Sequence, residues 1–278
     1  MEKKKLNNMF IYSEWDRICK DLSENYNCIL ANQILQQDDN KNWVVVKHDV
    51  ETNVSKALIM AKIEDKYDIK ATYYVQSSLL KDNKNILKQI SDLGHELTYH
   101  YDVLDANNGN YENAISEFRE TLTIFKDMNC EVQTVCPHGN PILIREGWSS
   151  NKDFFRKQEV SELFPNILDI VVHLPLKLKK DYLYISDASY GWKKISNVQD
   201  NDIFNSGDEV IVDLLDSLNQ SNECIVISTH PHRWQSSRIK ILIKIFLFQN
   251  VRFFARFLSK IPFFKKIMSK YYYLAKNI

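Results

Sequence analysis

Short apolar runs alternate with amphipathic stretches along most of this chain. Buried strands are predicted by apolar runs that end in polar residues, at 43–48, 71–75, 95–99, 132–136, 167–174, 182–186 and 224–228. Helices are predicted where apolar positions recur every three or four residues, at 53–67, 83–93, 111–128 and 210–218. Because strands that alternate with helices of this length are typical of βαβ units, we expect an α/β fold with a parallel sheet or barrel.

Helical spacing also marks both ends of the chain. Residues 1–40 repeat apolar positions such as Trp15 and Ile18, which predicts an N-terminal helical extension. Residues 238–278 carry ten of the 36 Lys and Arg residues and none of the 36 Asp and Glu residues, interleaved with apolar and aromatic side chains. No internal repeat or low-complexity linker divides residues 41–237, so we expect one domain between the extension and a basic helical tail.

The neutral total charge therefore conceals an acidic body and a basic tail. A basic, aromatic, amphipathic tail suits an anionic membrane surface, and peripheral contact with the inner membrane face is expected. Docking of the tail against the acidic body, or against a second copy in a homodimer, is the alternative. The tail is more apolar than phosphate contacts need, so no nucleic-acid partner is expected. No leader or membrane span is recognised and the five cysteines form no CxxC pair, which favours a cytoplasmic protein.

Polar residues with suitable chemistry follow several of the predicted strands, where α/β barrels assemble their active sites. Asp49 and Glu51 follow the first strand, with both side chains on one face, opposite His48. Two converging carboxylates repel each other unless a cation or a shared proton intervenes, so a divalent metal could bind one and leave the other as a base. A helix N-cap or turn role explains such acids equally well. His100 and His230 follow two other strands, and His230 is a candidate general acid.

Neighbouring turns offer candidate substrate contacts. Asp187 and Trp192 follow the predicted strand at 182–186, where the indole could stack on a sugar ring and the acid could bind hydroxyl groups. Trp234 follows His230 closely. His138 lies in a turn rich in Pro, Gly and Asn, and a substrate contact or a loop role is open to it.

Taken in order, these segments resemble the NodB-type polysaccharide deacetylases, carbohydrate esterases with a distorted (β/α) barrel. The resemblance runs from about Val44 to Trp234 and is closest to the branch whose first motif reads His-Asp-Val-Asp. The matching segments are His48-Asp49-Val50-Glu51, Lys70-Ala71-Thr72-Tyr73-Tyr74-Val75, Gly94-His95-Glu96-Leu97-Thr98-Tyr99-His100, the segment from Asp187 to Trp192, and Thr229-His230-Pro231.

The resemblance implies metal-dependent removal of an N- or O-acetyl group from a sugar of a surface polysaccharide or its lipid-linked precursor. By position, Asp49 corresponds to the catalytic base and is also counted with Glu51 and His100 among the residues that bind the metal. His230 corresponds to the general acid. The implied cofactor is a divalent ion, Zn²⁺ or a similar Lewis acid.

Three positions depart from the family pattern. Leu104 stands where the family has a second histidine ligand, and Glu51 replaces an Asp. The motif whose Arg orients the base is replaced by the segment from Cys136 to Pro141. The third ligand could then be a water or one of three residues, Asp102, Asp105 or His138. The alternative function is a catalytically inactive barrel that binds glycan or scaffolds a polysaccharide-biosynthesis complex.

Overall fold

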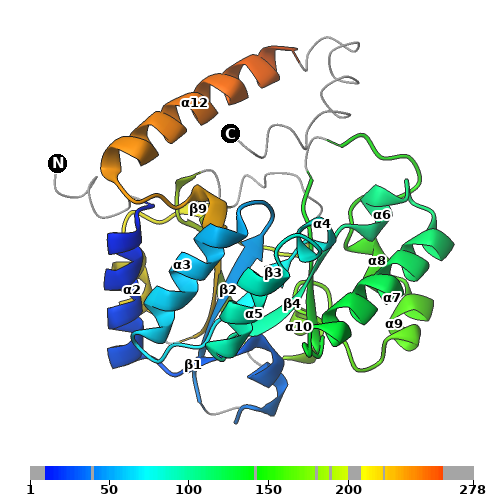
Figure 1. The fold of residues 1–278 in the computed structure, drawn as a ribbon. Coiled ribbons are helices and arrows are strands. Elements are labelled where there is room, and N and C mark those ends of the chain that lie inside the picture. Colours follow the sequence, from blue (N-terminus) through cyan, green and yellow to red (C-terminus); the bar gives the residue numbers. More distant parts are fainter. Residues whose placement is uncertain are drawn as a thin grey trace.

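The computed structural model describes residues 10–38, 41–140, 143–178, 181–187, 190–199, 208–221 and 223–258, the last eight as backbone. A mostly parallel sheet runs through the centre, with helices packed against it (Figure 1). The strand order is β6-β5-β4-β3-β2-β10-β7-β8-β9, and β1 pairs with β2. The strands are β1 (Cys28–Ile29), β2 (Val44–Val50), β3 (Thr72–Val75), β4 (Glu96–Tyr101), β5 (Thr134–Pro137), β6 (Leu168–Asp169), β7 (Tyr182–Ser186), β8 (Lys193–Lys194), β9 (Glu209–Val210) and β10 (Cys224–Thr229).

Helices connect the strands as the apolar periodicity predicts. Side-chain caps begin two of the longer ones: Asn53 accepts a hydrogen bond from the third helical N–H of α3, and Asn110 does the same for α7. The helices are α2 (Tyr12–Asn25), η1 (Ala31–Gln36), α3 (Val54–Asp65), α4 (Ser77–Leu80), α5 (Lys84–Asp92), α6 (Val103–Ala106), α7 (Tyr111–Asp127), α8 (Asp153–Arg156), α9 (Gln158–Leu163), α10 (Leu174–Lys177), α11 (Leu214–Asn219), η3 (Pro231–Arg233) and α12 (Arg238–Leu258).

The predicted α/β fold with a parallel sheet is confirmed, whereas a closed barrel is not seen. Strands β6 and β9 end the path of paired strands, and no strand in the described ranges joins one to the other. Among the strands of the described ranges, the pairs β7–β8 and β8–β9 are antiparallel and the others are parallel. Every position of the central strands β2 and β10 is buried, so both faces of the sheet are covered there.

Two predicted elements are wrong in extent. The strand predicted at 167–174 stops after Asp169, because its carboxylate accepts hydrogen bonds from the N–H groups of Val171 and Val172 and turns the chain. The helix predicted at 210–218 begins only at Leu214, where Asp213 caps the first turn, and β9 precedes it.

The two ends of the chain differ in how they join the body. Helix α2 buries Trp15 and packs against α3, and β1 pairs with β2, so the predicted extension is only partly helical and belongs to the packed fold. Helix α12 lies across the end of the molecule at which β2 ends (Figure 1). The predictions made for residues 1–9 and 259–278 fall outside the described residues. None of the described helices is both long enough and apolar enough to cross a membrane.

Candidate metal centre and active site

Strand β2 separates two groups of polar residues on its opposite faces. Lys47 and Asp49 lie on one face, and His48 points to the other, as strand alternation predicts. The Lys47 ammonium is fully buried and lies 2.7 and 2.9 Å from the two Asp49 carboxylate oxygens. It also lies 3.0 Å from the Cys136 sulfur. Lys47 is not among the site residues predicted from the sequence, although a charged residue within an apolar strand, two positions before Asp49, is a signal that could have indicated it.

This ion pair keeps Asp49 ionised. Burial alone would raise the pKa of the carboxyl group, but the charges of Lys47, His100 and His230 together outweigh burial and lower the pKa to about 2. The rings of Tyr74 and Tyr184 lie 5.1 and 5.9 Å from the ammonium, within cation–π range. Asp49 is therefore a carboxylate at neutral pH, as a base must be, and its orientation is held by a partner on its own strand.

Glu51, His100 and His138 come together at the C-terminal ends of β2, β4 and β5: Glu51 and His138 directly follow β2 and β5, and His100 is the last residue but one of β4. The Glu51 Oε1 atom lies 3.7 Å from His100 Nε2 and 3.3 Å from His138 Nε2. One potential ligand atom from each of the three residues lies within 4.8 Å of the other two. Zn²⁺ binds histidine nitrogen and carboxylate oxygen at about 2.0–2.2 Å, so ligand atoms around one ion lie about 3–4 Å apart. The two imidazoles and one carboxylate fit such an ion, with room for a further ligand.

The electrostatics of this trio favour a cation. Burial disfavours the ionised Glu51, but the His138 charge and hydrogen bonds from both imidazoles outweigh burial and hold its pKa well below the usual range. Burial also disfavours the imidazolium of His100, yet the Asp49 carboxylate together with the contacts to Cys136 and Glu51 outweighs burial and raises the pKa to about 10. His100 Nδ1 is 3.0 Å from the Cys136 carbonyl oxygen, so Nε2 is the nitrogen that faces Glu51.

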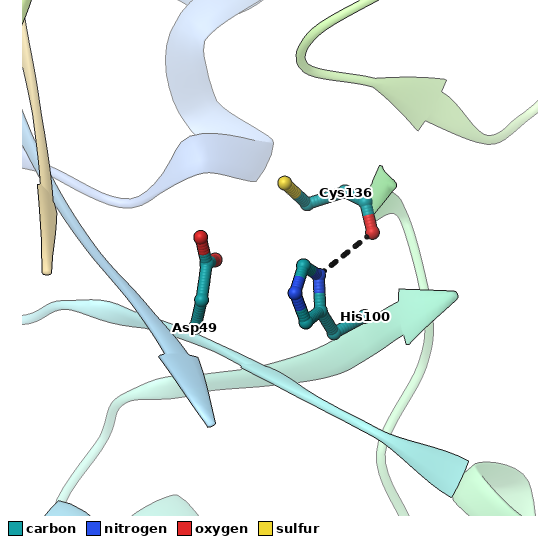
Figure 2. Close-up of side chains that lie close together, drawn as sticks. All are labelled: Asp49, His100 and Cys136. Carbon is teal, nitrogen blue, oxygen red and sulfur yellow. Dashed lines mark hydrogen bonds between the residues drawn. The ribbon is translucent and has the colours of Figure 1, made fainter. Parts of the chain in front are cut away.

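A second group of potential ligands shares His100. Figure 2 shows the side chains of Asp49, His100 and Cys136 gathered around one space, and their donor atoms also lie within 4.8 Å of one another. The Lys47 ammonium already contacts both Asp49 and Cys136. A dication there would meet this positive charge at close range, so the Glu51, His100 and His138 group is the better metal site.

A network of hydrogen bonds holds the loop that carries His138, the third candidate ligand. Asn151 donates to the His138 carbonyl oxygen and to the Asp105 carboxylate, both at 2.9 Å. Arg145 and Trp148 also bind Asp105, at 2.7–2.8 Å. Asp105 is thus used as an anchor and is not free to bind a metal, which corrects one of the alternatives for the missing ligand.

The adjacent family position cannot contribute either. Leu104 is fully buried in the apolar core, and Asp102 precedes the short helix α6. His138 is the candidate for the third ligand position, because its imidazole lies with Glu51 and His100. Its assignment as a substrate-contact residue changes to that of a candidate ligand.

His230 faces the same centre from β10. Its Nε2 atom lies 3.9 Å from Asp49 Oδ2 and 4.0 Å from Glu51 Oε1. Its Nδ1 atom lies 2.6 Å from Asp187 Oδ1, and Arg233 contacts the same oxygen at 2.7 Å. A carboxylate on Nδ1 fixes the tautomer and aims Nε2 at the site, as required of a general acid or base.

The predicted substrate contacts are not supported by burial. Asp187 is fully buried and serves His230 and Arg233, so it orients a histidine rather than binding sugar hydroxyls. Trp192 and Trp234 are 2% and 0% exposed, and both pack against Phe10. Aromatic packing from the N-terminal segment covers these indoles, so neither offers a free face to a sugar.

The opposite face of β2 carries a sealed cluster around Glu64. The Glu64 carboxylate receives hydrogen bonds from Trp15 Nε1 at 2.9 Å and Tyr73 OH at 2.6 Å, and it lies 2.7 Å from His48 Nε2. His95 Nδ1 is 3.8 Å away. All of these side chains are buried, so this cluster connects α2 and α3 to the sheet and has no access to substrate.

No protein-family model and no curated protein sequence matches the chain. The chain is similar to a family 4 carbohydrate esterase pseudoenzyme from Bacillus anthracis, with a TM-score of 0.41 and 16% identity over 76% of this chain, and it spans 61% of that structure. The catalytic domain of a peptidoglycan N-acetylglucosamine deacetylase from Eubacterium rectale gives a TM-score of 0.42 and 15% identity, over 75% of this chain and 84% of that one. A family 4 carbohydrate esterase from Streptomyces lividans gives 0.42 and 12%, over 76% and 89%. The solved structures to which the chain is similar are thus carbohydrate esterases and deacetylases of family 4.

Proposed function

We propose that the protein is a metal-dependent hydrolase that removes an N- or O-acetyl group from a sugar of a surface polysaccharide or its lipid-linked precursor. The observation that carries the proposal is the convergence of Glu51, His100 and His138 beside Asp49 and His230. The motifs that resemble those of NodB-type deacetylases support the reaction class and the sugar substrate.

Each residue has a defined task in this proposal. Glu51, His100 and His138 would hold a divalent ion, Zn²⁺ or a similar metal, which supplies Lewis-acid chemistry to a carbonyl oxygen and a water. Asp49, held ionised by Lys47, accepts the proton of the attacking water. His230, oriented by Asp187, donates a proton to the leaving amine or alkoxide.

Metal content and acetate release together test the proposal. Purified protein is expected to contain about one equivalent of divalent metal and to release acetate from an acetylated chito-oligosaccharide or acetylated xylan. Glu51→Ala and His100→Ala variants should lose both properties, because each removes a ligand. Wild-type protein without stoichiometric metal, even after incubation with Zn²⁺, would rule out this function.

One observation favours the second candidate function, an inactive barrel that binds glycan or scaffolds polysaccharide biosynthesis. Lys47 occupies both oxygens of Asp49, which gives the carboxylate a structural partner. Catalysis would be supported if the wild type releases acetate and a Lys47→Met variant with the same metal content releases it much more slowly. Metal binding and glycan binding without acetate release would support the inactive barrel.

The proposed location is the cytoplasm, at the inner face of the membrane. Helix α12 exposes Ile239, Leu242, Ile243 and Phe246 at helical spacing, and its charged residues are all basic. Binding to vesicles with anionic lipid should fall in a Leu242→Ser/Phe246→Ser variant. If that change leaves vesicle binding intact but alters the molecular mass in solution, the exposed face of α12 is a homodimer contact instead.

A further inference from the structure

Three lysines gather beside the turn that follows His230. Lys56 lies in the first turn of α3, and its ammonium donates hydrogen bonds to the carbonyl oxygens of His232 and Trp234 at 3.0 and 2.8 Å. Lys244 of α12 donates to the same His232 oxygen at 3.2 Å. The Lys56 and Lys244 ammonium groups are therefore immediate neighbours, because both donate to this one oxygen. Lys240, one turn earlier on α12, is close enough for its charge to act on Lys56.

The cluster has no compensating acid. Within the described ranges, no carboxylate forms an ion pair with Lys56, Lys240 or Lys244. Burial and the charges of Lys244 and Lys240 lower the pKa of Lys56 to about 8, and burial and the Arg233 charge lower that of Lys244. The first turn of α3 adds a positive helix-dipole potential. Holding like charges together in a half-buried place is unfavourable unless an anion joins them.

The position of the cluster connects it to the candidate active site. The shared carbonyl belongs to His232, two residues after His230, and the rings of these histidines are 5.8 Å apart. Helix α12 also touches the site's other flank, where Phe248 packs edge-on against Tyr190 at 5.2 Å. An anion bound by the lysines would therefore lie next to the turn that presents the proposed general acid.

We propose that Lys56, Lys240 and Lys244 form a subsite for a phosphate or diphosphate group carried by the sugar substrate. The inference rests on the proposed function and narrows it to a phosphate-linked acetylated sugar, either a nucleoside-diphosphate sugar or a polyprenyl-diphosphate sugar. Lysine ammonium groups bind phosphate as point charges, and several converging donors suit its three or more free oxygens. Neutral polysaccharide chains would leave the three charges unused.

Titration of inorganic pyrophosphate, followed by calorimetry, tests the subsite. All proteins are compared in the same metal state. A Lys56→Met/Lys244→Met variant should bind pyrophosphate at least about tenfold more weakly than wild type, because two charge-assisted contacts are lost. The control is Lys126→Met, which removes an exposed lysine at the end of α7. Equal affinity in wild type and the double variant would overturn the proposal.

A second variant separates recognition from folding. Lys56 also anchors the His232 turn, so the Met substitutions could disturb His230; a Lys56→Arg/Lys244→Arg variant keeps the charges and should stay within about threefold of wild-type affinity. Weak pyrophosphate binding in the Arg variant, with circular dichroism unchanged, would contradict a phosphate subsite built on charge.

Two substrate arms identify the source of the phosphate. Wild type and the Met double variant are titrated with UDP-N-acetylglucosamine and with a short polyprenyl-diphosphate N-acetylglucosamine in micelles. Lysine-dependent binding of either supports the subsite and names its source, whereas binding of neither overturns it. Metal content is measured on the same samples, so lysine-dependent binding in a protein without metal would leave the subsite standing while the proposed hydrolase fails.

Discussion

Histidine and carboxylate side chains lie on both faces of β2, but protein groups surround them closely on one face and leave more space between them on the other. On one face, the oxygens of Glu64 lie 2.6–2.9 Å from protein groups, and the carboxylate is fully buried. On the other face, Glu51 Oε1 has its nearest imidazole nitrogens at 3.3, 3.7 and 4.0 Å, with its side chain 12% exposed. The spacing around Glu51 leaves room for an ion, whereas that around Glu64 does not.

Histidine and carboxylate in a buried strand are therefore not enough to indicate chemistry. The cluster around Glu64 is satisfied by Trp15 and Tyr73, whose rigid side chains come from α2 and β3. The cluster around Glu51 lies at the strand ends, where His100 comes from the C-terminal end of β4 and His138 from the residue after β5. A buried carboxylate whose hydrogen bonds are all supplied by the protein stabilises the fold. A carboxylate with fewer protein donors is available to bind an external group.

Removal of Glu64 is expected to have the largest effect on folding. A Glu64→Ala variant leaves Trp15, His48 and Tyr73 buried without their shared acceptor, so the free energy of unfolding should fall by about 3–5 kcal/mol. Urea denaturation followed by circular dichroism measures the change. The matched Glu51→Ala variant of metal-free protein should lose less than about 1 kcal/mol. Equal losses would erase the distinction between the two faces.

Removal of His138 should have the next largest effect, on metal binding rather than on folding. A His138→Ala variant is expected to bind Zn²⁺ at least about 100-fold more weakly, since one of three protein ligands is lost. Competition with a chromophoric chelator measures the affinity. His173→Gln, which changes a half-buried histidine beside Ser161, is the control and should bind metal normally. Unchanged affinity in His138→Ala would return this residue to a loop or substrate role.

The pH dependence of stability separates the two faces further. In metal-free protein the pKa of His100 is raised to about 10, above the value near 6.5 of an unfolded histidine. The folded state then binds the extra proton, so the stability from His100 is complete below pH 6.5 and is lost as the pH rises toward 10. The Glu64 pKa is lowered, because the His48 charge and hydrogen bond, the His95 charge and the Tyr73 hydrogen bond together outweigh burial. The stability that Glu64 contributes is therefore lost as the pH falls below about 4.5.

Variants on each face should reveal these opposite slopes. The difference in unfolding free energy between wild type and His100→Asn should shrink by roughly 1–3 kcal/mol from pH 6.5 to 10. The difference between wild type and Glu64→Gln should instead shrink as the pH falls below 4.5. Urea midpoints across this range provide the measurement, and parallel curves for both variants would show that the two clusters titrate alike.

The sequence predicts those site residues that stand at the ends of predicted strands. Asp49, Glu51, His100 and His230 each follow a predicted strand, and parallel strands bring their ends together. The sequence offered His138 only as one of several alternatives for the third ligand, because the placement of its loop depends on Asn151 and Asp105, which meet across 46 residues of chain. The indoles of Trp192 and Trp234 were misread because Phe10, far away in sequence, covers them.

The smallest effect is expected from loosening the loop that presents His138. Asn151 is fully buried and joins the His138 carbonyl to Asp105, so an Asn151→Ala variant keeps every metal ligand but frees their support. Loss of such a supporting contact should weaken Zn²⁺ binding about tenfold, within the range known for residues that hold metal ligands in place. Asn83→Ala is the control, because the Asn83 side chain donates a hydrogen bond to the Leu79 carbonyl oxygen before α5 and touches no residue of the His138 loop in the described ranges. If Asn151→Ala binds metal as tightly as wild type, the metal site beside β2 does not depend on the contact by which Asn151 holds the His138 loop to Asp105.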